Sequence, residues 1–116
     1  MTDGIPKVDV QEAASRAGGD APDGPLIVDV REDDEFAAVR VEGVTHLPMS
    51  GFAARAAELP KDRPLLILCA SGARSAAATG FLLRIGWTDV ANVDGGINAW
   101  QRAGLPVARG APGTQD

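Results

Sequence analysis

The chain has 116 residues, of which 45% are hydrophobic and 23% charged, and it carries a formal net charge of −5. These values suit one compact domain with a single core. They argue against a nucleic-acid partner, because phosphate backbones attract proteins with an excess of Lys and Arg. A membrane-spanning protein is also not expected, since no apolar stretch approaches the ~20 residues that a bilayer-crossing helix needs.

The chain contains one cysteine and one histidine. A single cysteine cannot form an internal disulfide, which fits a reducing compartment, and the N-terminal residues lack the apolar segment of a secretory signal. We therefore expect a cytoplasmic protein. Because one Cys and one His cannot supply an ordinary tetrahedral zinc site, we expect no metal, and we expect no cofactor.

Short apolar runs alternate with helical stretches, and this order predicts an α/β domain with a mainly parallel sheet. The first helix is expected to have Asp9 as its N-cap and Glu12 three places on, and to end at Gly18 and Gly19. The next elements in chain order are a buried strand at 25–30, a helix beginning in the acidic segment 31–39, a short strand at 45–48 and a helix capped by Ser50.

The most apolar run of the chain, residues 64–68, predicts the central strand, because a strand covered on both faces has no polar side. An alanine-rich helix is expected at 73–86, a strand at 90–93 and a last helix at 96–104, opened by a turn with Asp94 as its cap. We expect a single domain over residues 5–107, with flexible ends at 1–4 and 108–116.

The segment CASGARS, residues 69–75, places the only cysteine directly after the central strand. A short glycine-containing loop between a strand and a helix can aim successive N–H groups at one point, and the helix N-terminus adds partial positive charge. A thiol in that position is expected to have a lowered pKa and to exist largely as the nucleophilic thiolate. The alternative interpretation is an inert buried cysteine.

The candidate site therefore consists of a nucleophile and a substrate-binding loop. The loop offers small residues that leave the backbone exposed to the pocket, one permanent cation and one hydroxyl that can cap the helix. These residues are Cys69 as nucleophile, followed by Ala70, Ser71, Gly72, Ala73, Arg74 and Ser75.

The chain resembles the rhodanese-like sulfurtransferases. CASGARS is similar to their active-site loop, which has a Cys, a glycine three residues on, and often an Arg or Thr before a Ser. Three further segments resemble the family in order and spacing: VDVREDDEF, VEGVTHLPM and GWTDVANVDGGINAWQRAGLPV. Together the four segments extend the resemblance over residues 5–107.

The resemblance implies a rhodanese-like three-layer fold, with a five-stranded, mostly parallel sheet flanked by helices. It also implies an enzyme. Cys69 would take a sulfane sulfur from a donor such as thiosulfate, become a persulfide, and pass the sulfur to cyanide, a small thiol or a protein thiol, such as that of a thioredoxin-like protein. The N–H groups of residues 70–75 would stabilise the anionic sulfur. Nucleic acid and membranes are not implied as partners, and we expect a monomer.

The chain departs from the family pattern in two places. The usual Gly-His-Ile segment is Val39-Arg40-Val41 here, so any role of that histidine is absent. Some members carry cations at the two positions after the nucleophile, where this chain has Ala70 and Ser71. Arg74 is consequently the only cation in the loop.

Two other functions share parts of this pattern. A cysteine phosphatase or arsenate reductase needs five residues between its Cys and Arg to hold a tetrahedral oxyanion, whereas four residues separate Cys69 from Arg74. A non-catalytic binding or regulatory module of the same architecture would typically lack the nucleophile, which this chain keeps.

The remaining candidates have structural explanations. Asp29 and Arg31 follow a strand at the sheet edge where open α/β sheets place their sites, and they are expected either to support the loop or to form a structural ion pair. The other residues considered are Glu35 as a first-turn helix charge, His46 as a structural or surface residue rather than part of a Cys–His dyad, and Trp87 and Trp100 as core aromatics.

Overall fold

The computed structural model describes residues 4–17 and 24–110. Its helices are α1 (Val10–Ala17), α2 (Asp33–Ala38), α3 (Met49–Arg55), the short 3-10 helix η1 (Ala56–Glu58), α4 (Ala73–Arg84) and α5 (Gly96–Arg102). Its strands are β1 (Lys7–Val8), β2 (Leu26–Asp29), β3 (Val39–Arg40), β4 (Thr45–His46), β5 (Leu65–Leu68), β6 (Val90–Val93) and β7 (Ala108–Arg109). Within these residues, no helix combines the length and the hydropathy needed to cross a bilayer.

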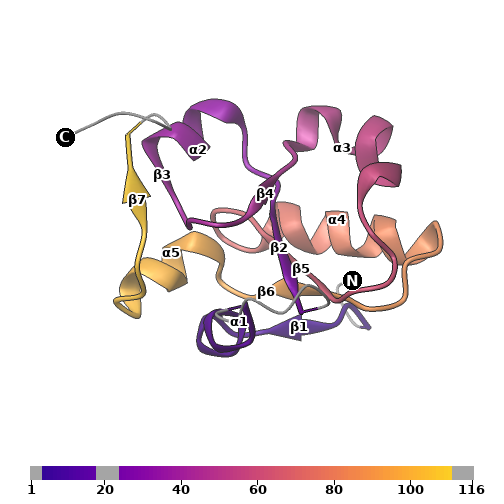
Figure 1. Cartoon of the computed structure of the whole chain (residues 1–116), viewed down its shortest axis with the longest axis horizontal. Helices are drawn as coiled ribbons and strands as arrows, with labels where there is room; N and C mark the ends of the chain where they lie inside the picture. The colour runs from indigo at the N-terminus through magenta and orange to yellow at the C-terminus, as the bar shows by residue number, and fades with distance from the viewer. Residues whose placement is uncertain (1–3, 18–23, 111–116) are drawn as a thin grey trace.

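Over the described residues, the main sheet has five strands in the order β1-β6-β5-β2-β4, and every neighbouring pair is parallel. Strand β5 lies in the centre, as its continuous apolar sequence predicts, and all four of its residues are buried. Helices cover both faces of the sheet (Figure 1). The predicted fold class, a five-stranded parallel sheet between layers of helices, is confirmed.

A second, two-stranded antiparallel sheet joins β3 to β7. Residues 108–116 were expected to be a flexible end, but Ala108 and Arg109 pair here with Arg40 and Val39. Regular structure therefore extends two residues beyond the predicted boundary, because these residues complete the backbone hydrogen bonds of β3. Residues 111–116 lie outside the described part.

The predicted cap of α1 agrees with the structure, and the predicted caps of α3 and α5 do not. The side chain of Asp9 accepts a hydrogen bond from the Glu12 N–H at 2.8 Å, as predicted, while the expected end of α1 at residues 18–19 lies outside the described residues. The prediction that Ser50 caps α3 is wrong, because α3 begins at Met49 and the Ser50 hydroxyl donates to Glu32 at 2.8 Å. The residue that caps α5 is a glycine and not Asp94.

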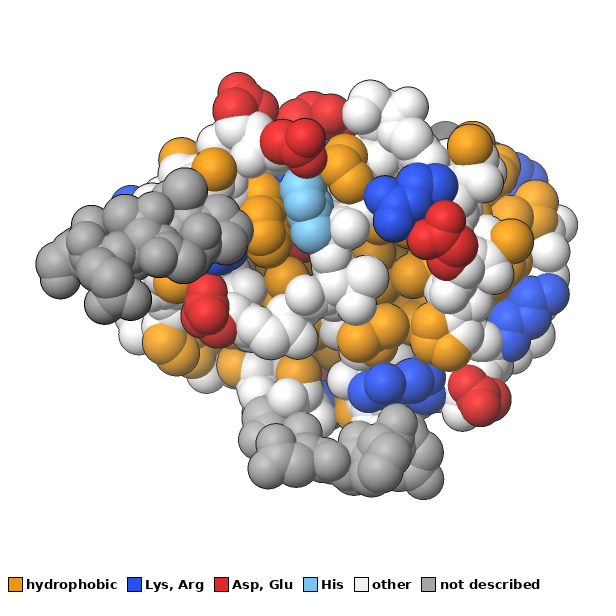
Figure 2. Space-filling model, turned by 45° about the horizontal axis from the view of Figure 1, so that its top comes forward, with side chains coloured by type: hydrophobic (Ala, Val, Ile, Leu, Met, Phe, Trp, Pro, Cys, Tyr) orange, Lys and Arg blue, Asp and Glu red, His pale blue; other side chains and the backbone are white. Residues whose placement is uncertain are grey.

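The acidic helix α2 lies next to the end of β4. His46, the last residue of β4, stacks on Phe36 with ring centroids 4.1 Å apart, and its Nδ1 lies 3.9 Å from the exposed carboxylate of Asp33. Figure 2 shows acidic side chains gathered beside the single histidine. His46 therefore packs against α2.

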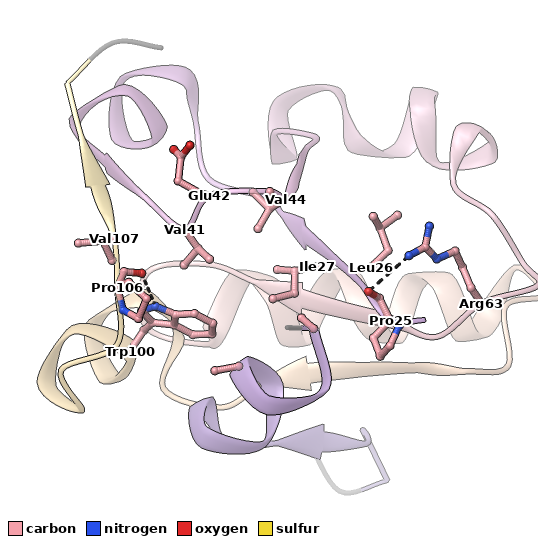
Figure 3. Close-up of a pocket in the computed structure, with 13 residues that line it drawn as sticks. Pro25, Leu26, Ile27, Val41, Glu42, Val44, Arg63, Trp100, Pro106 and Val107 are labelled. Atoms are coloured by element: carbon pink, nitrogen blue, oxygen red, sulfur yellow. Dashed lines mark hydrogen bonds between the residues drawn. The ribbon is translucent and has the colours of Figure 1, made fainter. Parts of the chain in front are cut away.

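Side chains of β5 alternate between two cores. Leu66 and Leu68 belong to the core under α1 and α5, together with Ile97 and Trp100. A hollow of about 450 Å³ lies on this side (Figure 3), and the described residues that line it include no cysteine, serine or histidine. The charged group of Arg63 at its margin is already bonded to the Gly24 carbonyl at 2.7 Å.

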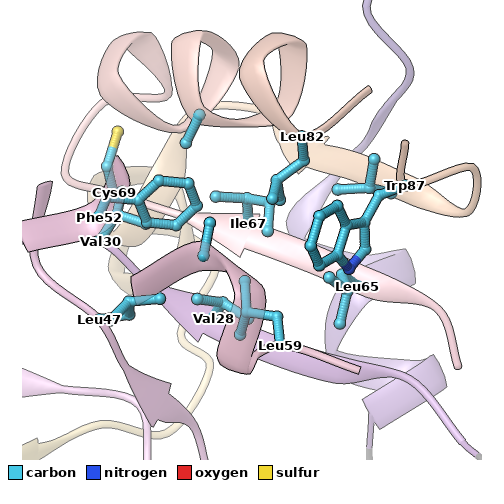
Figure 4. Close-up of a cluster of buried hydrophobic side chains, with 13 residues drawn as sticks. Val28, Val30, Leu47, Phe52, Leu59, Leu65, Ile67, Cys69, Leu82 and Trp87 are labelled. Atoms are coloured by element: carbon cyan, nitrogen blue, oxygen red, sulfur yellow. The ribbon is translucent and has the colours of Figure 1, made fainter. Parts of the chain in front are cut away.

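The opposite core, under α3 and α4, contains Leu65 and Ile67 of β5, Phe52 of α3 and Leu82 of α4. Cys69 follows β5 on this same side, at the edge of the cluster, with its sulfur directed toward the first turn of α4 (Figure 4). The period of two along the strand therefore decides which core the thiol faces.

Candidate active site

Cys69 lies at the carboxyl edge of the sheet, directly after β5. Because the strands of the main sheet are all parallel, this edge also carries the last residues of β2, β4 and β6. The side chain of Cys69 is fully buried, with 0% exposure. The sulfur is therefore shielded from solvent by the neighbouring groups of the fold.

Hydrogen-bond donors converge on the Cys69 sulfur. The Gly72 N–H donates to Sγ at 3.1 Å and the Ser75 hydroxyl lies 3.2 Å from it. Burial raises the pKa of the thiol, but the Ser75 hydroxyl and the backbone N–H groups of Ser75, Gly72 and Ser71 together outweigh burial and lower it below its ordinary value of 9.0. The loop thus favours the thiolate, as the sequence predicts for this position.

Gly72 gives the loop its shape. Its φ of +103° lies in the left-handed region that favours glycine, and it caps α4. This conformation turns the Gly72 N–H toward the sulfur, while the Gly72 carbonyl accepts a bond from the Asn92 side chain at 3.2 Å.

Ser75 and Asn92 form a buried polar pair beneath the sulfur. Ser75 is 0% exposed and Asn92 is 6% exposed. The Ser75 hydroxyl contacts both Cys69 Sγ and Asn92 Oδ1, and the Asn92 amide is oriented by its bond to the Gly72 carbonyl. Since a hydroxyl has one proton, Ser75 can donate to the thiolate or to Asn92, but not to both at once. The predicted role of Ser75 as a helix cap is wrong, because its side chain faces the sulfur instead.

Asn92 is a site residue that sequence analysis missed. It lies within β6, and an asparagine in an otherwise apolar strand is a signal that could have revealed it, because Asn is disfavoured in strands and a buried amide needs partners.

The N-terminus of α5 holds the loop from behind. The N–H groups of Ile97 and Asn98 donate to the carbonyls of Cys69 and Ala70 at 2.8 and 3.0 Å. The backbones come so close that a Cβ on Gly96 would lie 2.6 Å from the Ala70 carbonyl. Fixing these carbonyls on the α5 side leaves the loop N–H groups free to face the sulfur. The glycine pair 95–96 therefore shapes the site through backbone contact.

Arg74 does not stand free beside the sulfur. Its guanidinium forms two hydrogen bonds to the Glu35 carboxylate, at 2.7 and 2.9 Å, and both side chains are about one-third exposed. The hydrogen bond from Arg74 lowers the pKa of Glu35 to about 2, against the opposing effect of burial. Glu35 is thus both a first-turn charge of α2 and the partner of the loop cation.

Asp29 and Arg31 form a buried ion pair at the end of β2. Their side chains are 0% and 2% exposed, and Arg31 Nη2 lies 2.9 Å from Asp29 Oδ2. Arg31 also donates to the carbonyls of Glu35 and Val39 at 3.2 and 2.6 Å, so that it ties the end of β2 to α2 and to the residue that follows α2. The ion pair is therefore connected by hydrogen bonds to α2, which carries Glu35.

The structure thus arranges the predicted loop residues unequally around the sulfur. Gly72 and Ser75 contact it, and Ser71 contributes its N–H. The Ala70 carbonyl binds α5, and Ala73 begins α4.

The two tryptophans lie outside the loop. Trp87 and Trp100 are buried core residues whose indole N–H groups bind the carbonyls of Pro60 and Pro106.

Comparison with known proteins relates this arrangement to a family. The chain matches the rhodanese-like domain over residues 9–103. It is 44% identical to a sulfurtransferase of Allochromatium vinosum over 82 residues, which are 71% of this chain and 77% of the relative. It is 32% identical to thiosulfate sulfurtransferase GlpE of Vibrio cholerae over 81 residues, which are 70% of this chain and 76% of the relative.

Solved structures show the same fold. A rhodanese-related protein of Thermoplasma volcanium superposes with a TM-score of 0.80 at 27% identity, over 90% of this chain and 98% of that chain. A thiosulfate sulfurtransferase of Pseudomonas aeruginosa superposes with a TM-score of 0.80 at 28% identity, over 91% of this chain and 20% of that longer chain.

Proposed function

The chain belongs to the rhodanese-like domain family, and we propose that it is a sulfurtransferase that carries a sulfane sulfur as a persulfide on Cys69. The observation that carries this proposal is the set of donors around the one thiol, namely the Gly72 N–H and the Ser75 hydroxyl at the start of α4. These donors lower the pKa of Cys69 despite its burial. The sulfurtransferases among its relatives support the same assignment.

In the first half-reaction the enzyme takes the sulfane sulfur from the donor. With thiosulfate as donor, the Cys69 thiolate attacks the sulfane sulfur, a new S–S bond forms, and the bond from the sulfane sulfur to the sulfonate sulfur breaks. Sulfite leaves with the electron pair, and the negative charge moves to the outer sulfur of the Cys69 persulfide. Backbone N–H groups of the loop are suited to stabilise this anion, as an oxyanion hole stabilises oxygen.

In the second half-reaction the enzyme passes this sulfur to an acceptor. A nucleophilic acceptor such as cyanide, a small thiolate or a protein thiolate attacks the outer sulfur, and the Cys69 thiolate leaves with the electron pair of the S–S bond. Charge and electrons balance without an added oxidant or reductant. We place this chemistry in a monomer in the cytoplasm, where a lone cysteine stays reduced.

The test is direct detection of the persulfide. After incubation with thiosulfate and removal of the donor, intact-mass spectrometry of the wild-type chain should show the addition of one sulfur, which a reducing thiol then removes. Cys69→Ser should show no addition and no transfer of sulfur from thiosulfate to cyanide, with an unchanged circular dichroism spectrum. Substantial transfer by verified Cys69→Ser protein would refute the proposal.

A further inference from the structure

The one cation of the active-site loop is already neutralised by a carboxylate. Arg74 is the only Lys or Arg among residues 69–75. Both of its terminal nitrogens are bonded to Glu35, at 2.7 and 2.9 Å. A bidentate pair of this kind leaves few guanidinium donors for a substrate and cancels the charge that would attract an anion.

Glu35 is held in this position from its own side. Its Oε1 accepts a bond from the Glu32 N–H at 3.0 Å, in the capping box that opens α2. The Arg31 guanidinium, itself fixed by Asp29, donates to the Glu35 backbone carbonyl. The carboxylate is therefore presented to Arg74 by a rigid turn, and an approaching anion must compete with it.

The surroundings of the pair are acidic. Glu32, Asp33 and Asp34 precede Glu35 at the start of α2, and Figure 2 shows this concentration of acidic side chains on the surface. The pKa of Arg74 is raised, first by its hydrogen bond to Glu35 and further by the charges of Glu35, Cys69 and Glu32. Arg74 therefore lies within electrostatic reach of the Cys69 sulfur. The other guanidinium beside Glu35, that of Arg31, is neutralised by Asp29, so the charges around Arg74 remain negative in sum.

We propose that Glu35 is a specificity-determining residue that, by occupying Arg74, favours sulfur donors of low negative charge, such as organic persulfides and thiosulfonates, over the thiosulfate dianion. This inference rests on the proposed sulfur transfer through Cys69. For a persulfide donor, the Cys69 thiolate attacks the outer sulfur of RS–SH, the new S–S bond forms, and RS⁻ leaves with the electron pair. That donor carries at most one negative charge, whereas thiosulfate carries two.

Two donors that differ mainly in charge test the proposal. Thiosulfate carries two negative charges, and methanethiosulfonate carries one on a similar skeleton, with methanesulfinate as its leaving group. Replacing Glu35 by Gln keeps an acceptor for the Glu32 N–H but removes the charge that occupies Arg74. In the Glu35→Gln variant at low ionic strength, kcat/KM for thiosulfate should rise about fivefold or more, and that for methanethiosulfonate about twofold.

The control is Glu58→Gln, which removes one charge from an exposed pair with Arg55 and should leave the ratio of the two kcat/KM values unchanged. A second measurement needs no variant. In the wild-type protein, added salt should raise the kcat/KM for thiosulfate relative to that for methanethiosulfonate, because screening weakens the repulsion of the doubly charged donor more.

The outcomes separate the two proposals. The role of Glu35 is supported if the ratio of kcat/KM for thiosulfate to kcat/KM for methanethiosulfonate rises in Glu35→Gln and also rises with salt in the wild type. If both donors form the Cys69 persulfide but Glu35→Gln and salt leave the ratio unchanged, Glu35 does not determine specificity and the sulfurtransferase proposal stands. If neither donor forms a persulfide on Cys69, the proposed function itself fails and the inference fails with it.

Discussion

Two arginine–carboxylate pairs lie close together at the carboxyl edge of the sheet, and they differ in almost every physical respect. Asp29–Arg31 is at most 2% exposed, and its guanidinium also binds two backbone carbonyls. Glu35–Arg74 is about one-third exposed, and its guanidinium binds only the carboxylate among the described residues. Water can replace either partner of the second pair but not of the first. The buried pair is therefore expected to contribute mainly to the stability of the fold, while the exposed pair is open to competition from water and ions.

Breaking the buried pair should have the largest effect. Arg31→Met leaves the Asp29 carboxylate buried without its partner, and we expect the free energy of unfolding to fall by about 3–5 kcal/mol. Arg74→Met is the matched control, and it should change stability by less than about 1 kcal/mol because its pair is solvent-exposed. Urea denaturation followed by circular dichroism measures both. Equal midpoints for the two variants would contradict the comparison.

The second largest effect is expected from disturbing the close backbone contact between α5 and the active-site loop. In Gly96→Ala the new Cβ would collide with the carbonyls of Cys69 and Ala70, and its φ of +59° would also be strained. The loop must shift, and a displacement of about 1 Å is expected to lower kcat/KM about 100-fold. Gly43→Ala, at an open position with φ of +80°, controls for the strain alone. Activity close to wild type in Gly96→Ala would show that the loop tolerates the shift.

Removing the hydroxyl at the sulfur should have a smaller effect with a defined pH dependence. Ser75→Ala removes one of the donors that counteract burial, so the pKa of Cys69 should rise. The rising limb of the pH–rate profile should move to higher pH, and kcat/KM near pH 7 should fall by up to about tenfold, as the loss of one hydrogen bond predicts. Ultraviolet absorbance of the thiolate against pH reports the shift directly, and an unmoved titration would exclude Ser75 as a donor to the sulfur.

The same variant also tests the linkage between the thiol and folding. A lowered thiol pKa contributes stability that is fully present above the unfolded value of 9.0 and is lost as the pH falls through the folded value. Ser75→Ala should therefore lose stability relative to the wild type more at alkaline pH than at pH 6. An equal loss at both pH values would mean that the hydroxyl stabilises the fold only through packing and its bond to Asn92.

The smallest expected effect is that of Arg74→Ala on catalysis. An uncommitted guanidinium in the loop would be worth about tenfold in kcat/KM for thiosulfate. Because Glu35 already occupies it, we expect a loss of only about threefold. Steady-state kinetics with thiosulfate and cyanide measures the change. A loss well above tenfold would mean that the donor displaces Glu35 and uses the full charge of Arg74.

Local signals in the sequence predicted the central strand, the loop that begins at Cys69 and the helix that follows the loop. The apolar run at 64–68 and the glycine at 72 act through neighbouring residues, so their pattern is visible in one short segment. The partner of Arg74 is 39 residues away, and the amide that binds Ser75 is 17 residues away. Such pairs depend on how strands are ordered in the sheet, and a single sequence carries no local sign of that order.

The sequence separation of the partners also explains why the strand pair β3–β7 was not predicted. Each strand has two residues, and their partners are about 70 residues apart in the chain. Two-residue strands have too little periodicity to be recognised, because alternation needs several positions before it differs from chance. Composition at the C-terminal end therefore indicated a flexible segment.

The alternation of β5 between two cores has a consequence for how such a site tolerates insertions and deletions. Leu65, Ile67 and Cys69 face α4, and the residues between them face α5. Losing or gaining one residue inside the strand would rotate the thiol to the opposite side of the sheet, away from Ser75 and the N-terminus of α4. Substitutions along β5 can be absorbed by repacking, but its length cannot change by an odd number of residues without dismantling the site.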